Sequence, residues 1–471
     1  MREYDLIVRG GVLVNEAGQF RGDVCVRNGQ IVALTIDTKK TADQVIDATD
    51  KLVFPGVIDA HVHMQIMQQD KYPTADDFES GTRAAAAGGV TTILDFFETG
   101  EEGQSLWQAY QDRRALADPQ VVIDYGLHAV TTSETDLAIE IDSLIEAGIT
   151  SYKLFQVYGR LALSDAQLYA TLELVASRKA LATLHAENGQ IAVLLTDRLR
   201  TEGRKAAIDH AYSRPAFVEA ACIQTAINFT QAVNGSLYIV HLSTREGLAA
   251  IRRAQESGLR VIAETCPQYL VLDESNLARP DGNLFLCTPP LRPVEHQGPL
   301  WEGLSSGAIQ VVATDHCSFF RQQKLNAPSF FQAPGGLGSV ELLLPILYSE
   351  GVAKGRIGLS SMVRSLCHDP ATIFGLAPRK GSLAPGSDAD LVIFDPRQEW
   401  RVDSGMLHGK DDYSVYQGLR LIGSVETTIS RGEVIYHSGE LMADPGRGQY
   451  LPRDLPSQEA LHGILRTSME G

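Results

Sequence analysis

The chain has 471 residues, of which 44% are hydrophobic and 21% charged, and its 41 Lys and Arg against 58 Asp and Glu give a formal net charge of −17. This composition is that of a folded globular protein, and the length allows two or three domains with a large core, which excludes disorder and a small disulfide-stapled fold. The negative charge argues against nucleic acid or an anionic membrane as a partner, because phosphate groups would be repelled.

The first ten residues carry charged side chains where a secretory signal would be apolar. No stretch approaches the roughly 18 apolar residues that a membrane helix needs. The six cysteines are scattered and form no C-x-x-C pair. We therefore expect a cytoplasmic protein with reduced thiols and no membrane partner.

The N-terminal segment, residues 1–54, predicts short antiparallel strands. Residues 5–15 contain β-branched runs interrupted by a glycine pair, and residues 22–34 contain two such runs around Asn28-Gly29. An Asn-Gly pair between two apolar runs is typical of a β-hairpin.

The pattern changes at about residue 55, where short apolar runs begin to alternate with helix-like segments such as 76–88, 164–177 and 244–258. Ser164 and Thr244 are candidate N-caps, and Gly88 and Gly258 candidate helix stops. There are eight apolar runs, at residues 56–61, 91–96, 121–126, 151–155, 181–185, 237–241, 260–265 and 309–315. Eight strand–helix repeats predict an α/β fold, a closed (β/α)8 TIM barrel over residues 55–375. The alternative, a doubly wound open sheet, lacks its Gly-x-Gly-x-x-Gly after the first strand.

Strand-like patterns return after about residue 376, at residues 381–394 and 425–436. Strands at both ends of the chain predict a smaller β-sandwich domain assembled from residues 1–54 and 376–440. Residues 441–471 are rich in Pro, Arg and Gly, and we expect them to form a C-terminal arm.

The motif Asp59-x-His61-x-His63 follows the first barrel run. Alternate side chains of a strand face the same side, so both imidazoles would enter the barrel and could reach one metal ion. With 12 histidines in 471 residues, about 0.3 such pairs arise by chance, so the pair alone is a weak signal. Its place at the carboxyl end of a strand strengthens the signal, because barrel enzymes carry their chemistry there.

Three further candidates, His185, His241 and Asp315, close the fifth, sixth and eighth runs. Each alone fits a hydrogen-bonded histidine or a helix-capping aspartate. Together with His61 and His63 at one end of one barrel, they predict a metal site. Imidazole and carboxylate without thiolate suit Zn²⁺, with Mn²⁺, Co²⁺ or Fe²⁺ as alternatives.

Lys153 lies within the fourth run. Because an unpaired lysine is rare inside a core, one interpretation is that its side chain reaches outward to solvent. The other interpretation is that CO2 carboxylates the amine, and that the resulting carbamate bridges a pair of cations.

Several motifs together resemble the cyclic amidohydrolases, and within them the hydantoinase/dihydropyrimidinase group. The resemblance extends to about residue 450 and rests on Asp59-x-His61-x-His63, 151–158, 183–188, 238–243, 313–317, 74–83, 264–269, 288–292 and 381–390. It implies two divalent ions per chain, most simply Zn²⁺. His61, His63 and Asp315 would bind one ion, His185 and His241 the other, and carboxylated Lys153 (N6-carboxylysine) would bridge them.

The resemblance also implies a substrate site and a reaction. Tyr158 would donate to the oxyanion, and the backbones of Thr288 and Gly335 would hold the ring, with Gly335 standing where the group often has Asn. A metal-bridging hydroxide would open a hydantoin or dihydropyrimidine ring to an N-carbamoyl amino acid, and Asp315 would move the proton. The expected partner is this small cyclic amide, and the expected assembly a homotetramer.

Alternatives remain at this stage. An allantoinase-like or other cyclic imide or ureide hydrolase would share the same metal ligands. A protein of a different class, like the non-catalytic collapsin response mediator proteins, would have lost them. Met64, Ile66 and Met67 either present an apolar wall to a ring substituent or pack as an ordinary loop.

Overall fold

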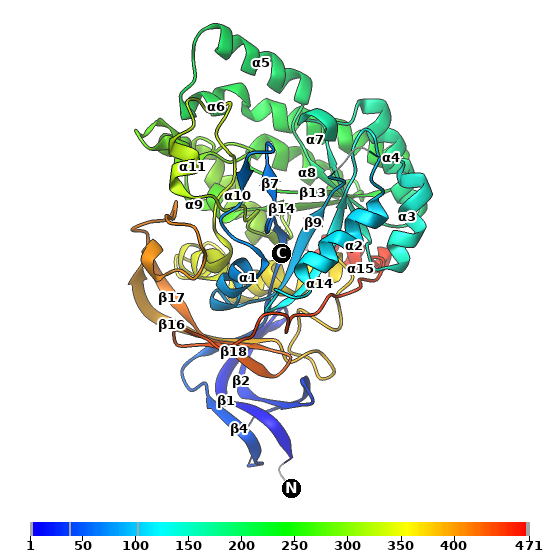
Figure 1. The fold of residues 1–471 in the computed structure, drawn as a ribbon. Helices are drawn as coiled ribbons and strands as arrows, with labels where there is room; N and C mark the ends of the chain where they lie inside the picture. The colour runs from blue at the N-terminus through cyan, green and yellow to red at the C-terminus, as the bar shows by residue number, and fades with distance from the viewer. Residues whose placement is uncertain (1–2, 37–38, 101–102, 468–471) are drawn as a thin grey trace.

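The structure, a computed structural model, describes residues 3–36, 39–100 and 103–467. A parallel barrel surrounded by helices forms the larger part, and a sheet built from both ends of the chain lies at one end of it (Figure 1). None of the helices in the described ranges is long and apolar enough to cross a membrane.

The barrel contains eight parallel strands in sequence order, and each of the eight predicted runs contributes one. Their bounds are β6 Val57–Val62, β9 Val90–Phe97, β10 Asp124–Val130, β11 Ser151–Phe155, β12 Leu181–His185, β13 Ser236–Ile239, β14 Arg260–Thr265 and β15 Val311–Val312. A parallel bridge between Val62 and His316 joins the segment after the last strand, β15, to the first strand, β6. The predicted barrel is therefore confirmed, and the open sheet is excluded.

Helices cover the barrel, and the two predicted N-caps act as expected. Ser164 and Thr244 each accept a backbone N–H at the start of α4 and α8, and Asp77 does the same at the start of α1. The helices are α1 Phe78–Ala87, α2 Leu106–Ala117, α3 Leu137–Glu146, α4 Asp165–Ser177, α5 Gly189–Thr201, α6 Ala207–Ser213, α7 Ala216–Ala232, α8 Arg245–Glu256, α9 Pro267–Val271, α10 Gln297–Ser305, α11 Arg321–Leu325, α12 Leu343–Ile346, α13 Leu359–Val363, α14 Asp369–Ile373 and α15 Gln458–Thr467.

The terminal segments together form the smaller β domain, as predicted, and its strands belong to one nine-stranded sheet. Its strands are β1 Tyr4–Asn15, β2 Gly18–Arg27, β3 Gln30–Thr35, β4 Ala42–Asp47, β5 Leu52–Pro55, β16 Leu391–Arg401, β17 Arg420–Ser430, β18 Glu433–His437 and β19 Glu440–Leu441. β5 pairs with β16, which joins the two ends of the chain. The Asn28-Gly29 turn connects β2 to β3, and both residues have positive φ.

The sheet and the barrel are joined through buried charges. The Lys380 ammonium lies 2.7 Å from carboxylate oxygens of Asp124 and Asp390 and 3.0 Å from Asp388. Asp124 begins β10, and Asp390 directly precedes β16. Residues 446–451 also return to the barrel, where Tyr125 pairs with Gln449 and Leu451. The division of the chain at residues 54, 375 and 440 stays a prediction.

Candidate functional site

All nine residues that the sequence analysis proposed for the site line one cavity of about 810 Å³. They come from positions far apart in the chain and meet at the carboxyl ends of the barrel strands. The residues are His61, His63, Lys153, Tyr158, His185, His241, Thr288, Asp315 and Gly335. Strand ends of a closed parallel barrel meet at one mouth, which explains why local sequence patterns so far apart meet here.

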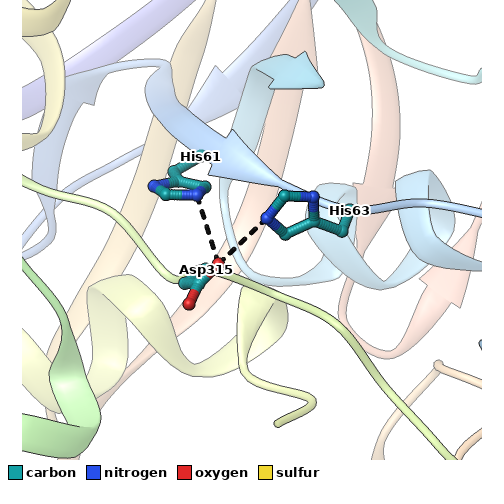
Figure 2. A group of neighbouring side chains, drawn as sticks. All are labelled: His61, His63 and Asp315. Carbon is teal, nitrogen blue, oxygen red and sulfur yellow. Dashed lines mark ion pairs between the residues drawn. The ribbon is translucent and has the colours of Figure 1, made fainter. Parts of the chain in front are cut away.

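His61, His63 and Asp315 form the tightest group (Figure 2). Oδ1 of Asp315 lies 3.2 Å from Nε2 of His61 and 3.1 Å from Nε2 of His63. These donor atoms lie within 4.8 Å of one another, so one ion could contact all three. Two imidazoles and a carboxylate are ligands that Zn²⁺ accepts.

His185 and His241 lie beside this group. Their ring centroids are 4.5 Å apart, and the His241 ring is 5.5 Å from that of His61. Among the described residues, Nδ1 of His241 is buried without a hydrogen-bond partner, and Nε2 of His61 makes no hydrogen bond beyond its ion-pair contact with Asp315. Unpaired buried imidazole nitrogens are costly, and a bound cation would satisfy them. The residues present therefore fit a metal centre.

The electrostatics of the pocket keep the imidazoles neutral and the aspartate charged. Burial lowers the pKa of His61, His185 and His241. Burial alone would raise the pKa of Asp315, but the neighbouring His61 and His63 lower it to about 2. A neutral imidazole and an ionised carboxylate are the forms that bind metal ions.

Lys153 is buried, with 1% of its surface exposed, which excludes the outward orientation. Its Nζ lies 5.1 and 5.2 Å from the ring centroids of Phe96 and Phe155. Burial lowers the pKa of the Lys153 ammonium to about 8. The side chain is therefore directed inward, and it lines the same cavity as the histidines.

Tyr158, His241 and Asp315 all have positive φ, at 78°, 38° and 53°. A left-handed conformation costs a non-glycine residue about 1–2 kcal/mol. Such strain concentrates at functional sites, where the surrounding fold imposes it. Here three residues proposed from sequence share it.

Tyr158 lies at the pocket wall. Its ring is 5.2 Å from that of His185, and the Arg214 guanidinium lies 5.5 Å above it. The pocket leaves 37% of the residue accessible, yet desolvation by the walls raises the pKa of its hydroxyl. The hydroxyl therefore remains a hydrogen-bond donor at neutral pH.

Two buried carboxylates hold the metal-site residues in place, and one of them was not predicted as a site residue. Oε1 of Glu264 lies 2.8 Å from Nδ1 of His61 and accepts from the backbone N–H of His241. Its other oxygen accepts from the Tyr238 hydroxyl. A charged residue inside the apolar run 260–265 was the available signal. Asp59 accepts from the backbone and hydroxyl of Thr314, next to Asp315.

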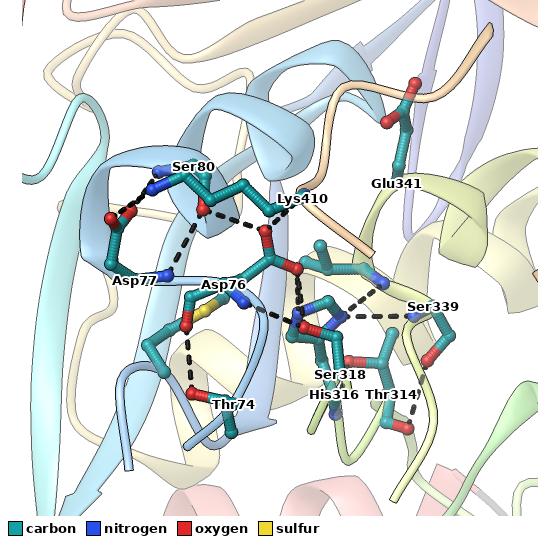
Figure 3. A network of polar contacts seen from close by, with 12 residues as sticks. Thr74, Asp76, Asp77, Ser80, Thr314, His316, Ser318, Ser339, Glu341 and Lys410 are labelled. Atoms are coloured by element: carbon teal, nitrogen blue, oxygen red, sulfur yellow. Dashed lines mark hydrogen bonds and ion pairs between the residues drawn. The ribbon is translucent and has the colours of Figure 1, made fainter. Parts of the chain in front are cut away.

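A second polar network fixes the chain beyond Asp315 (Figure 3). The buried Asp76 carboxylate accepts from the Ser318 hydroxyl at 2.7 Å and the Lys410 backbone N–H at 2.8 Å. It also pairs with Nε2 of His316 at 3.2 Å. This network ties the segment before α1 to the segment that carries Asp315, and it gives His316 a structural role.

The three apolar side chains after His63 divide between the two interpretations. Met64 is fully buried, and its sulfur lies against Gly81 of α1, so it packs in the core. Ile66 and Met67 line the cavity. Loop packing therefore applies to Met64, and Ile66 and Met67 remain candidates for the apolar wall.

Comparison with known proteins places this arrangement in a family. The model of the amidohydrolase family matches residues 52–435. The chain belongs to the amidohydrolase family. This amidohydrolase is 39% identical over 458 residues to a D-hydantoinase from Streptomyces coelicolor, covering 95% of this chain and 97% of the relative. It is 40% identical over 453 residues to a D-phenylhydantoinase from Escherichia coli, covering 95% and 98%.

Solved structures agree with the fold of the amidohydrolase. A dihydropyrimidinase from Brevibacillus agri superposes with a TM-score of 0.93 at 36% identity, covering 96% of this chain and 99% of that one. An L-hydantoinase from Arthrobacter aurescens superposes with a TM-score of 0.89 at 31% identity, covering 96% and 100%. Both matches extend over the barrel and the terminal sheet.

Proposed function

We propose that this amidohydrolase opens cyclic amide rings of the hydantoin or dihydropyrimidine type, giving N-carbamoyl amino acids. The observation that carries the proposal is the group of His61, His63 and Asp315 at the barrel mouth, inside a cavity that also holds His185, His241 and Lys153. Relatives named hydantoinase along nearly the whole chain support this reaction class.

We propose that the cavity holds two divalent ions, most simply Zn²⁺. His61, His63 and Asp315 would hold one, and His185 and His241 the other. When bound, a pair of such ions activates water and polarises a carbonyl oxygen. His185 would use Nδ1, because its Nε2 lies 2.8 Å from Glu187.

Carboxylated Lys153 would bridge the two ions. Four neutral imidazoles and one carboxylate compensate little of the charge of two dications, and a carbamate adds an anion at the required place. The buried position of Lys153 between Phe96 and Phe155 supports this assignment, since a free ammonium would repel the cations.

The chain's own residues would then complete the chemistry. Asp315 would accept a proton from the attacking water and pass it to the leaving ring nitrogen, as a general base that becomes a general acid. The Tyr158 hydroxyl would donate to the oxygen of the attacked carbonyl as it becomes anionic. The backbones of Thr288 and Gly335 would bind the ring amide and orient it.

Ile66 and Met67 border the cavity and would contact a substituent of the ring. Flexible apolar side chains accommodate groups of different shape, which favours a substituted hydantoin over dihydroorotate. An allantoinase-like activity is the second candidate within this reaction class.

A panel of rings tests the function directly. Purified protein with measured metal content is incubated with hydantoin, 5-substituted hydantoins, dihydrouracil, allantoin and dihydroorotate, and carbamoyl products are quantified. We expect close to two ions per chain and turnover of hydantoins or dihydrouracil. Preferred turnover of allantoin would select the second candidate, and a metal-free protein inactive on every ring would indicate a scaffold relative.

We further propose a homotetramer, from the family resemblance, and a cytoplasmic location, since all six cysteines are buried and free. Sedimentation velocity tests the first proposal. Fractionation of the source cells tests the second.

A further inference from the structure

Two backbone segments border the cavity, and we name them together the backbone shelf: residues 286–288 and 335–336. Leu286, Thr288, Gly335 and Gly336 all line the cavity. The segments are separated by more than forty positions in sequence. A single backbone hydrogen bond, from the Gly336 N–H to the Leu286 carbonyl at 2.9 Å, joins them directly among the described contacts.

Lys324, in α11, lies behind this shelf and is completely buried. Its ammonium donates to three backbone carbonyls, those of Leu284 at 3.2 Å, Leu286 at 2.8 Å and Gly336 at 2.5 Å. Three acceptors match the three N–H donors of a lysine ammonium. Burial lowers the pKa of Lys324 to about 7.

The contacts of Lys324 differ from those of Lys380, another buried lysine. Lys380 pairs with the carboxylates of Asp124, Asp388 and Asp390. Lys324 has only neutral carbonyls within hydrogen-bond distance, although burying an ammonium without a carboxylate is expensive. An amine buried at that cost, at hydrogen-bond distance from both segments of the shelf, indicates a positional role.

The shelf cannot easily be held by packing alone. A Cβ on Gly336 would lie 2.5 Å from the Cys317 carbonyl, so this position has no side chain to pack. A Cβ on Gly335 would meet only the Thr288 hydroxyl, at 3.6 Å, and the cavity lies on its other side. Two successive glycines at this segment therefore depend on hydrogen bonds to keep one conformation. The Gln68 side chain binds the N–H and the carbonyl of Gly335, at 2.7 and 2.8 Å, and Lys324 binds the carbonyl of Gly336.

We propose that Lys324 is a positioning residue for the cyclic amide ring: it joins Leu286 to Gly336 and thereby fixes the backbone of Thr288 and Gly335. This inference rests on the proposed function, in which those two backbones bind the ring. Lys324 touches neither the ring nor the metal ligands. Its removal should weaken ring binding and leave the chemical step and the metal content almost unchanged.

The test compares Lys324→Met with Lys380→Met, a matched loss of a buried ammonium far from the cavity. Both variants should lower the melting temperature. In metal-replete protein, Lys324→Met should raise KM for hydantoin about tenfold or more with kcat within about threefold, and Lys380→Met should leave KM unchanged. Hydrogen–deuterium exchange should accelerate in peptides covering the backbone shelf in Lys324→Met alone.

The outcomes separate the two proposals. A folded Lys324→Met protein with unchanged KM and unchanged exchange at the shelf overturns the role of Lys324. Wild-type protein that opens no ring overturns the proposed function, while the exchange comparison still decides whether Lys324 orders the shelf. If Lys324→Met does not fold, Lys324→Gln, which keeps two N–H donors, should show a smaller KM increase, and a normal KM there overturns the proposal.

Discussion

Replacing Tyr158 with phenylalanine tests the assignment of the oxyanion donor. The change removes one hydroxyl and keeps the ring, so the contacts at 5.2 Å with His185, 6.0 Å with Phe155 and 5.5 Å with the Arg214 guanidinium can persist. The left-handed backbone at Tyr158 is imposed by the loop and does not depend on the hydroxyl. The variant should therefore fold and bind metal as the wild type does.

The expected loss concerns the transition state. Removing one preorganised donor to an oxyanion costs about 3–4 kcal/mol, or roughly 10²–10³ in kcat. The desolvated, protonated Tyr158 hydroxyl makes such a strong donor possible. KM should change by less than about threefold, because the hydrogen bond strengthens mainly as the negative charge develops.

The assay is steady-state hydrolysis of the best ring from the panel, with metal content measured on the same samples. Tyr212→Phe is the matched control, because Tyr212 is half exposed and lies outside the cavity lining. An unchanged kcat in metal-replete Tyr158→Phe would refute the oxyanion role. A raised KM with unchanged kcat would show instead that the hydroxyl contributes only to ground-state binding.

Three further predictions follow from buried charged groups. Lys153→Ala should lose bound metal together with activity, as measured by elemental analysis, and a metal-replete, fully active variant would contradict the bridging role. Glu264→Gln should weaken metal affinity about 10–100-fold in chelator competition, because the partner of His61 becomes a poorer acceptor; equal affinity would show that orientation of His61 needs no charge. Burial and the charge of Asp76 raise the pKa of Asp411 to about 7. The folded state therefore holds this proton more tightly than the unfolded state does. As a result, the stability of the fold decreases as pH rises from about 4 to about 7. Asp411→Asn should therefore raise the melting temperature at pH 8 and have little effect at pH 4, and an equal effect at both pH values would refute this linkage.

The barrel could be predicted because its signals are local. Each strand is a short apolar run, and Ser164 and Thr244 cap helices within their own segments. The histidines and Asp315 inherit this advantage, since each lies at or just after the end of a run, whereas Lys153 lies within its run and was assigned through the family resemblance. A closed barrel brings the carboxyl ends of all its strands to one mouth. The position of a residue at the end of an apolar run therefore identified residues that meet in the folded protein.

The residues that hold the site in place carry no such mark, because their function depends on distant partners. Glu264 contacts a histidine that is 203 positions away in the sequence. Lys324 lies in a short polar helix whose sequence is typical of a solvent-exposed turn. Its side chain is nevertheless buried and binds backbone carbonyls that are 12 to 40 positions away. The burial of such a side chain depends on how whole helices and strands pack against one another. The hydrophobic periodicity of the sequence does not contain this information. A reactive group can thus be recognised by residue type and position, whereas the group that orients it is recognised only by its contacts. This asymmetry predicts that unassigned functional residues in related barrels will be buried charges within hydrogen-bond distance of the backbone at the mouth.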